Sequence, residues 1–223
     1  GWCALASNTD SRQNIGVGYI SLQDNTTGEF NTSVGSASLS NNTTADYNVG
    51  VGYNSLTTNT TGADNTAVGS NALFSNTTGC MNTVIGSCAL NKNTTADCNT
   101  AVGRLALACN TTGYRNVALG VLPLGANTTG NYNVGIGYGA GNDVTTGTNN
   151  LLFGEGAGRS ASPSGAITTG SNNVVLGNNN ITDLYCADTT ISSSDQRDKA
   201  DIEDFTHGLD FITKLNPKTY VWD

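Results

Sequence analysis

Residues Asn65 to Met81 read Asn-Thr-Ala-Val-Gly-Ser-Asn-Ala-Leu-Phe-Ser-Asn-Thr-Thr-Gly-Cys-Met, and this 17-residue unit recurs along most of the chain. Its first residue is an asparagine in every copy: Asn14, Asn31, Asn48, Asn65, Asn82, Asn99, Asn116, Asn133, Asn150 and, after six extra residues, Asn173. Its fifth residue is always glycine. A short fixed period is typical of a solenoid. The repeat therefore predicts an all-β fold, a parallel β-solenoid or β-roll with one 17-residue rung per coil.

We number positions within each rung from one, the asparagine, to seventeen. Position four is always Val, Ile, Leu or Phe, and position two is Thr or an apolar residue. These two positions share one face of a strand, since side chains alternate along it. Leucine dominates position nine, so positions two, four and nine are predicted to point into the coil. Position three is mostly Gly, Ser or Ala, which predicts a close approach by another chain on the opposite face.

The remaining repeat positions carry turn chemistry. Position five is glycine, which accepts positive φ, and positions twelve to fifteen usually read Asn-Thr-Thr-Gly, whose side chains can bond the local backbone. Stacked rungs would place the asparagines of positions one and twelve in ladders along the axis. The same asparagines often form Asn-x-Thr sequons, but we interpret these as turns rather than as glycan acceptors.

A single coil of this kind is a weak folding unit. The cost of ordering 17 backbone residues exceeds what a few buried side chains per rung contribute. We therefore expect several parallel copies to share an axis, as a parallel homotrimer.

The repeat phase also divides the chain. Gly1 already occupies position five, so we expect the natural protein to extend upstream. Residues 1–177 are predicted to form the shaft, residues 178–193 a β-rich neck, and residues 194–223 a separate domain that is incomplete. In that last segment Phe205, Leu209, Ile212 and Leu215 recur at helical spacing and Pro217 follows, which predicts a short C-terminal α-helix.

Composition excludes several functions. The net charge of −8 disfavours nucleic acid as a partner. No apolar stretch is long enough to span a membrane, so no membrane insertion is expected. The six cysteines show no metal-binding spacing, and the glycine-rich runs lack a phosphate-binding motif, so we expect neither a metal nor a cofactor.

The C-terminal segment resembles a known family. Its motif Ser194-Asp195-x-Arg197-x-Lys199-x-Asp201-Ile202, followed by the predicted helix, Leu-x-Pro and Tyr-x-Trp, is similar to the start of the endosialidase-type intramolecular chaperone domain. The resemblance implies a domain at the end of phage tail fibres that trimerises, aligns the upstream strands and then cuts itself off. The family's own domain continues beyond the residues matched here.

By that resemblance the single autoproteolytic cut falls between Ser193 and Ser194. Ser194 would be the nucleophile, Lys199 its base and Asp195 a positioning residue. A serine hydroxyl needs such a neighbouring base to attack a carbonyl. The Asn-x-x-Val-Gly rungs are also similar to the head repeats of trimeric autotransporter adhesins, although those repeats are shorter.

We therefore expect a structural fibre shaft for viral host attachment, located in the virion and without activity on external substrates. One alternative is a cell-surface or secreted adhesive filament, and another is an ice-binding solenoid, suggested by the paired threonines at positions thirteen and fourteen. Aromatic residues recur at positions six, sixteen and seventeen, where they could bind a host-surface glycan or receptor: Tyr19, Phe30, Tyr47, Tyr53, Tyr114, Tyr132 and Tyr138.

Overall fold

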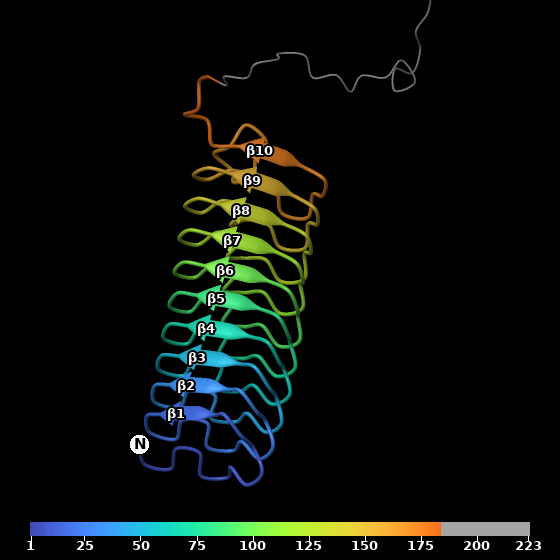
Figure 1. Ribbon diagram of the computed structural model, residues 1–223. Coiled ribbons are helices and arrows are strands. Elements are labelled where there is room, and N and C mark those ends of the chain that lie inside the picture. The colour runs from blue at the N-terminus through green and yellow to red at the C-terminus, as the bar shows by residue number, and fades with distance from the viewer. Residues whose placement is uncertain (184–223) are drawn as a thin grey trace, which may run out of the picture. The chain divides into compact units, whose positions relative to one another are not determined.

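The computed structural model describes residues 1–183, and residues 1–182 form one compact unit. Each rung contributes one three-residue strand to a single sheet (Figure 1). The strands are β1 (Ile15–Val17), β2 (Thr32–Val34), β3 (Val49–Val51), β4 (Thr66–Val68), β5 (Thr83–Ile85), β6 (Thr100–Val102), β7 (Val117–Leu119), β8 (Val134–Ile136), β9 (Leu151–Phe153) and β10 (Val174–Leu176). The predicted all-β parallel solenoid is confirmed. The described residues contain no α-helix, and the helix predicted near Phe205 lies outside them.

Strand pairing follows the sequence period. The sheet order is β1 to β10 without a crossover, and every pair is parallel. Ala67 in β4, for example, lies opposite Val84 in β5, one repeat later. Between β9 and β10 the partners are Leu152 and Val175, because the extra residues leave the stack. Ile167 returns to the core at the end of that excursion and is buried. Residues 178–183, the described part of the predicted neck, form a turn without a strand.

The sheet faces are the reverse of the prediction. Position three points into the coil, where Ala67, Val84 and Ala101 are fully buried. Positions two and four point outward, and Ile85 and Leu119 at position four are 43% and 46% exposed. The predicted inward place of positions two and four is therefore wrong. The prediction for position nine is confirmed, because its leucines are fully buried: Leu22, Leu39, Leu56, Leu73, Leu90, Leu107 and Leu124.

The narrow interior explains why position three is small. A leucine at position nine packs under position three of the next rung. A Cβ added to Gly50 would lie 3.2 Å from Cγ of Leu39, and one added to Gly135 would lie 2.8 Å from Cγ of Leu124. The small side chains therefore fit against the chain's own leucines. They give no evidence of a close approach by another chain, which was the predicted reason for them.

Two rungs carry glycine at position nine, Gly141 and Gly158, and the first of them shows an exchange of large and small residues most clearly. Position nine is Gly141 instead of leucine, and position three of the next rung is Leu152, which is fully buried. A Cβ added to Gly141 would lie 2.5 Å from Cδ1 of Leu152. Leu152 therefore fills the core from the strand, whereas in the rungs that have a leucine at position nine that leucine fills it from the side opposite the strand.

The corners of each rung use left-handed backbone. Positions seven, nine and seventeen have positive φ even where they are not glycine, as at Asn71 (54°), Leu73 (52°) and Met81 (57°). Position five needs glycine for a further reason. Gly69 has φ of +135°, and an added Cβ would lie 2.8 Å from the carbonyl oxygen of Gly86 in the rung above.

Two buried asparagine ladders run along the stack, as predicted. At position twelve, Nδ2 of Asn76 donates to Oδ1 of Asn59 and to the carbonyl of Gly79, both at 2.8 Å. At position one, the backbone N–H of Asn82 donates to Oδ1 of Asn65 at 3.0 Å. Because these amides are buried, the sequons at position twelve are not accessible to glycosylation, in agreement with their interpretation as turns.

Candidate functional site

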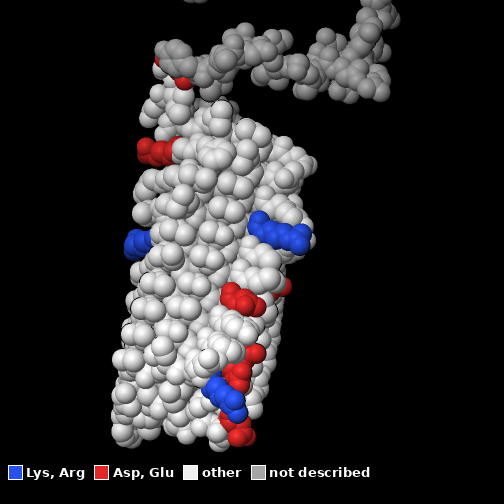
Figure 2. Space-filling model, in the orientation of Figure 1, with Lys and Arg blue, Asp and Glu red and all other residues white. Residues whose placement is uncertain are grey.

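The outward-pointing side chains of positions two and four form a continuous surface across β1 to β10, which we call the outer strand face. Every residue of this face is apolar or threonine, and none is charged. Figure 2 shows the surface over the strands free of Lys, Arg, Asp and Glu, which gather at its margins. Its most exposed large members are Ile15, Val17, Val34, Ile85, Val117, Leu119, Val174 and Leu176. Contiguous exposed apolar surface is common at protein interaction sites, so the outer strand face is a candidate for one.

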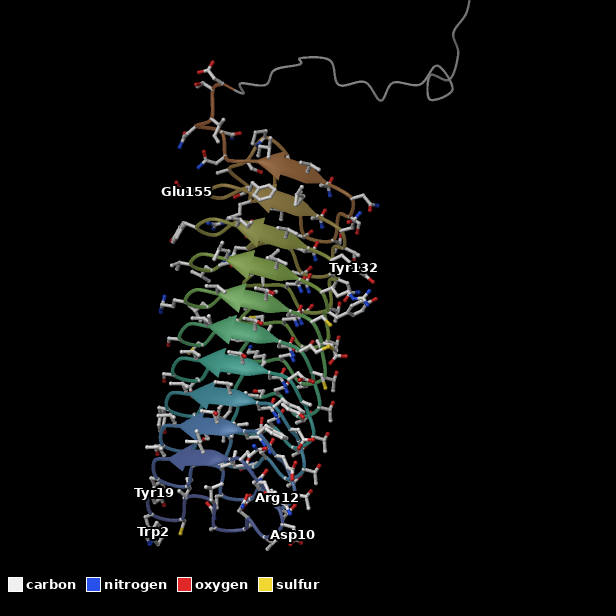
Figure 3. The ribbon with its side chains drawn as sticks, in the orientation of Figure 1. Trp2, Asp10, Arg12, Tyr19, Tyr132 and Glu155 are labelled. Carbon is white, nitrogen blue, oxygen red and sulfur yellow. The ribbon has the colours of Figure 1, made fainter. Side chains whose placement is uncertain are left out.

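Two edges flank the outer strand face. Position six forms one edge, with Tyr19 and Glu155, and positions sixteen and seventeen form the other, with Tyr132 (Figure 3). Aromatic rings stack between rungs on both edges. The rings of Trp2 and Tyr19 lie 5.5 Å apart, and those of Phe30 and Tyr47 lie 4.9 Å apart and nearly parallel. The predicted aromatic rows therefore exist, although they are interrupted by other residue types.

A hollow of about 440 Å³ opens on the second edge. It spans the corners of four successive rungs and includes none of the strand residues. Its lining residues are Met81, Thr95, Ala96, Asp97, Cys98, Thr112, Tyr114, Arg115 and Tyr132. A second hollow of about 260 Å³ also borders Tyr132, but strand residues Val134, Leu151 and Val174 help to line it.

Tyr114, Arg115 and Tyr132 form a compact group in the larger hollow. The two tyrosine rings meet edge to face, with centroids 5.3 Å apart at 76°. The guanidinium carbon of Arg115 lies 5.9 Å from the ring centre of Tyr114 and 5.6 Å from that of Tyr132. Its Nη1 donates to the hydroxyl of Tyr132 at 3.0 Å. The group therefore combines cation–π contacts with a hydrogen bond.

The backbone fixes these side chains. Arg115 and Tyr132 occupy position seventeen, with φ of 54° and 57°. Side chains at position sixteen accept hydrogen bonds from the backbone of the preceding rung. Oδ1 of Asp97 accepts from the N–H of Cys80 at 2.7 Å, and Oδ1 of Asn131 accepts from the N–H of Tyr114 at 2.9 Å. The solenoid thus holds the lining residues in register.

The three side chains of this group change one another's pKa values. The hydrogen bond between the phenols, followed by their charge interaction, raises the pKa of Tyr114. That hydrogen bond and the one from Arg115 lower the pKa of Tyr132. The pKa of Arg115 is raised, mainly by its hydrogen bond to Tyr132. Tyr132 is therefore the acceptor that the other two groups stabilise as an anion.

The predicted catalytic residues Ser194, Asp195 and Lys199 lie outside the described residues. The threonine columns proposed for ice binding do not form a paired outward array. At position thirteen the hydroxyl donates to the next rung's backbone, as Thr43 does to the carbonyl of Thr60 at 3.1 Å. Only position fourteen, such as Thr61, is exposed. Within residues 1–183, no helix is long and apolar enough to cross a membrane.

Comparison with known proteins identifies the C-terminal segment. Residues 194–223 match the protein family described as the chaperone of endosialidase. This match confirms the resemblance carried by the motif that begins at Ser194. Neither the curated proteins nor the solved structures gave a match. A β-solenoid followed by such a segment fits a fibre shaft with its chaperone.

Proposed function

We propose that the chain is the shaft of a homotrimeric fibre that serves viral host attachment, in the virion or another extracellular location. The observation that carries this proposal is the outer strand face, which is apolar or threonine at every rung and uncharged. The chaperone match at residues 194–223 supports it independently. In this reading the shaft is a rigid spacer.

A second copy of the chain is the best partner for the outer strand face. The face repeats at the rung spacing, so a partner that covers all of it needs the same repeat. A parallel copy in register places apolar residues and threonines against their equivalents at each height. No charge loses its hydration in such an interface. The exposed residues of positions two and four thus replace the small residues of position three as the argument for assembly.

The chaperone segment meets a need created by the repeat. Strands β4 and β6 have the same sequence, Thr-Ala-Val, so a shifted alignment of two copies changes few contacts. A domain that joins the copies at one end sets their register before the rungs pair. The cut between Ser193 and Ser194, with Ser194 as nucleophile, Lys199 as base and Asp195 as positioning residue, would then make assembly hard to reverse.

Analytical ultracentrifugation and native mass spectrometry of the full chain test the assembly. We expect a homotrimer for the wild type. Ile85→Lys puts a charge into the outer strand face and should abolish the trimer, whereas Thr61→Lys, at an exposed position outside that face, should retain it. Circular dichroism shows whether the Ile85→Lys chain still folds. A monomeric wild type, or a trimeric Ile85→Lys variant, would contradict the proposal.

Self-cleavage is tested separately, by denaturing mass spectrometry of the complete natural protein. A released fragment beginning at Ser194 is expected in the wild type. It should be absent from Ser194→Ala and strongly reduced in Lys199→Ala, because both remove part of the nucleophilic pair. Ser193→Ala, next to the proposed nucleophile, is the matched control and should still be cut. Cleavage that persists in Ser194→Ala assigns the nucleophile elsewhere.

A further inference from the structure

The hollow lined by Tyr114, Arg115 and Tyr132 has no part in the proposed assembly. Its lining comes from positions fourteen to seventeen and leaves out the outer strand face, so the contacts proposed for that face do not use it. We propose that this hollow is a saccharide-binding site that recognises a hydroxyl-rich sugar ring. The proposal deepens the host-attachment part of the function above.

The size and setting of the hollow suit a small ligand. A volume of about 440 Å³ falls within the range of small-molecule sites. The solenoid backbone supports its lining residues, so a ligand does not have to order a loop. Position sixteen is held by bonds such as that from Cys80 to Asp97. A preformed site loses less entropy on binding.

The orientation of the aromatic rings separates this pair from the other on the same edge. Phe30 and Tyr47 stack face to face at 4.9 Å and 7°, so each ring covers the face of the other. Tyr114 and Tyr132 instead meet at 76°, so an edge and not a second face lies against one of the rings, and both rings line the hollow. The two pairs are similarly exposed, and it is the ring angle and the hollow that distinguish Tyr114 and Tyr132. The C–H groups of a sugar ring pack well on an aromatic face, because that face carries partial negative charge.

The polar groups of the hollow provide both donors and an acceptor. One N–H of Arg115 is used by Tyr132, and the planar guanidinium has further donors. Asp97 uses Oδ1 for the N–H of Cys80, and its second carboxylate oxygen can accept. Thr95 and Thr112 add hydroxyl groups. Adjacent hydroxyls of a sugar donate and accept together, so this combination matches them.

The charge balance favours a neutral sugar. Arg115 and Asp97 carry opposite charges, and they are the charged side chains that line the hollow. A carboxylated sugar would gain from Arg115 but would be repelled by Asp97. Tyrosine and arginine are also enriched in protein interfaces, so contact with another copy of the chain is the competing use of this surface.

A glycan array probed with the full chain tests the proposal. The array carries neutral hexose oligosaccharides, N-acetylhexosamine oligosaccharides and carboxylated oligosaccharides, and isothermal titration calorimetry measures affinity for the bound ones. We expect binding that is strongest for the neutral sugars. Tyr132→Asn should weaken it by about tenfold or more, since it removes the ring and keeps a residue found at position seventeen in Asn149.

Tyr47→Asn is the matched control, because Tyr47 shares position seventeen and lies outside the hollow. It should leave saccharide affinity unchanged. Arg115→Lys keeps the charge but loses the planar donor group, so affinity should fall. Binding that is confined to carboxylated sugars and lost in Tyr132→Asn would still support the site and identify Arg115 as its main contact.

The proposal is overturned if no saccharide binds, or if Tyr132→Asn and Tyr47→Asn behave alike. Ultracentrifugation of the same variants separates the competing use. A change in oligomeric state in Tyr132→Asn, without saccharide binding, would assign the hollow to contact between copies. A trimer that binds no saccharide defeats this inference alone. A monomer that binds saccharide through Tyr132 defeats only the proposed assembly.

Discussion

Asn127 ends the side-chain ladder of position twelve because the residue above it in the next rung is Val144. Nδ2 of Asn127 donates to Oδ1 of Asn110 at 2.8 Å, as in the rungs below. Its own Oδ1 is buried without a hydrogen-bond donor, whereas Oδ1 of Asn76 accepts from Asn93. Asn76 and Asn127 therefore share a repeat position but differ in whether Oδ1 accepts a hydrogen bond.

Asn76→Val should destabilise the shaft by about 2 kcal/mol or more, because it leaves Oδ1 of Asn59 and one N–H of Asn93 buried without a hydrogen-bond partner. Asn127→Val is the matched control. It leaves Oδ1 of Asn110 without a donor but removes Oδ1 of Asn127, which already lacks one, so the number of unpaired buried oxygens at this end of the ladder does not change. It should be nearly neutral. Denaturant unfolding at one fixed protein concentration measures the difference. Equal losses in the two variants would refute the role of the ladder.

Gly141 and Leu152 should show strong energetic coupling. Gly141→Leu alone would clash with Leu152, and Leu152→Ala alone should cost about 2–5 kcal/mol through the cavity it leaves. The double variant restores the arrangement of the regular rungs, with leucine at position nine opposite a small residue. A double-mutant cycle should give a favourable coupling of about 1–3 kcal/mol. Additive effects would show that the two sites do not share one space.

Ala37→Asn should stabilise the shaft. Ala37 has φ of 56°, a conformation that costs about 1–2 kcal/mol for most residues and less for asparagine. Position seven is already asparagine in the next two rungs, at Asn54 and Asn71. We expect a gain of about 0.5–1 kcal/mol in unfolding free energy. Ala63→Asn, at a position without positive φ, is the control and should bring no comparable gain.

Tyr132 should ionise at lower pH than Tyr114, as followed by NMR of the ring signals. A lowered folded-state pKa means that Tyr132 favours the folded state above its unfolded pKa of about 10, and that this contribution disappears as pH falls through the folded pKa. Tyr114, with a raised pKa, contributes below that unfolded pKa and loses its contribution as pH rises through its folded pKa.

Tyr114→Phe removes the largest cause of the shift and should move the pKa of Tyr132 back up. Tyr47→Phe, whose ring stacks on Phe30 away from the hollow, should leave the titration of Tyr132 unchanged. A Tyr132 titration that is insensitive to Tyr114→Phe would show that the two phenols do not interact in solution.

The period, the register and the asparagine ladders follow directly from the sequence. Each depends on residues that recur at one spacing, such as Asn65 and Asn82, and stacking places them together whatever the shape of the coil. The aromatic row at positions sixteen and seventeen could also be predicted from residues that recur in the sequence, but the hollow lined by Tyr114 and Tyr132 could not. It arises because Tyr114 and Tyr132 meet at an angle and Arg115 inserts beside them, which no spacing indicates.

The facing of the strands was predicted wrongly for a physical reason. Alternation places Thr66 and Val68 on one side and Ala67 on the other, but it does not say which side is inside. The larger side chains suggested the interior. Within this narrow coil, however, leucine from position nine already fills the space, so only a small residue fits at position three. The leucine that recurs at position nine, opposite the strand, was the residue that indicated how little space remains inside the coil for position three.

Because each strand contacts only the strands of adjacent rungs, the number of rungs is not fixed by the fold. Removal of residues 65–81 would bring Asn48 below Asn82 and Val49 beside Thr83, which are the same kinds of neighbour as before. Recombination within the gene can therefore lengthen or shorten the spacer by whole units. The distance between the two ends of the shaft can evolve while its cross-section stays constant.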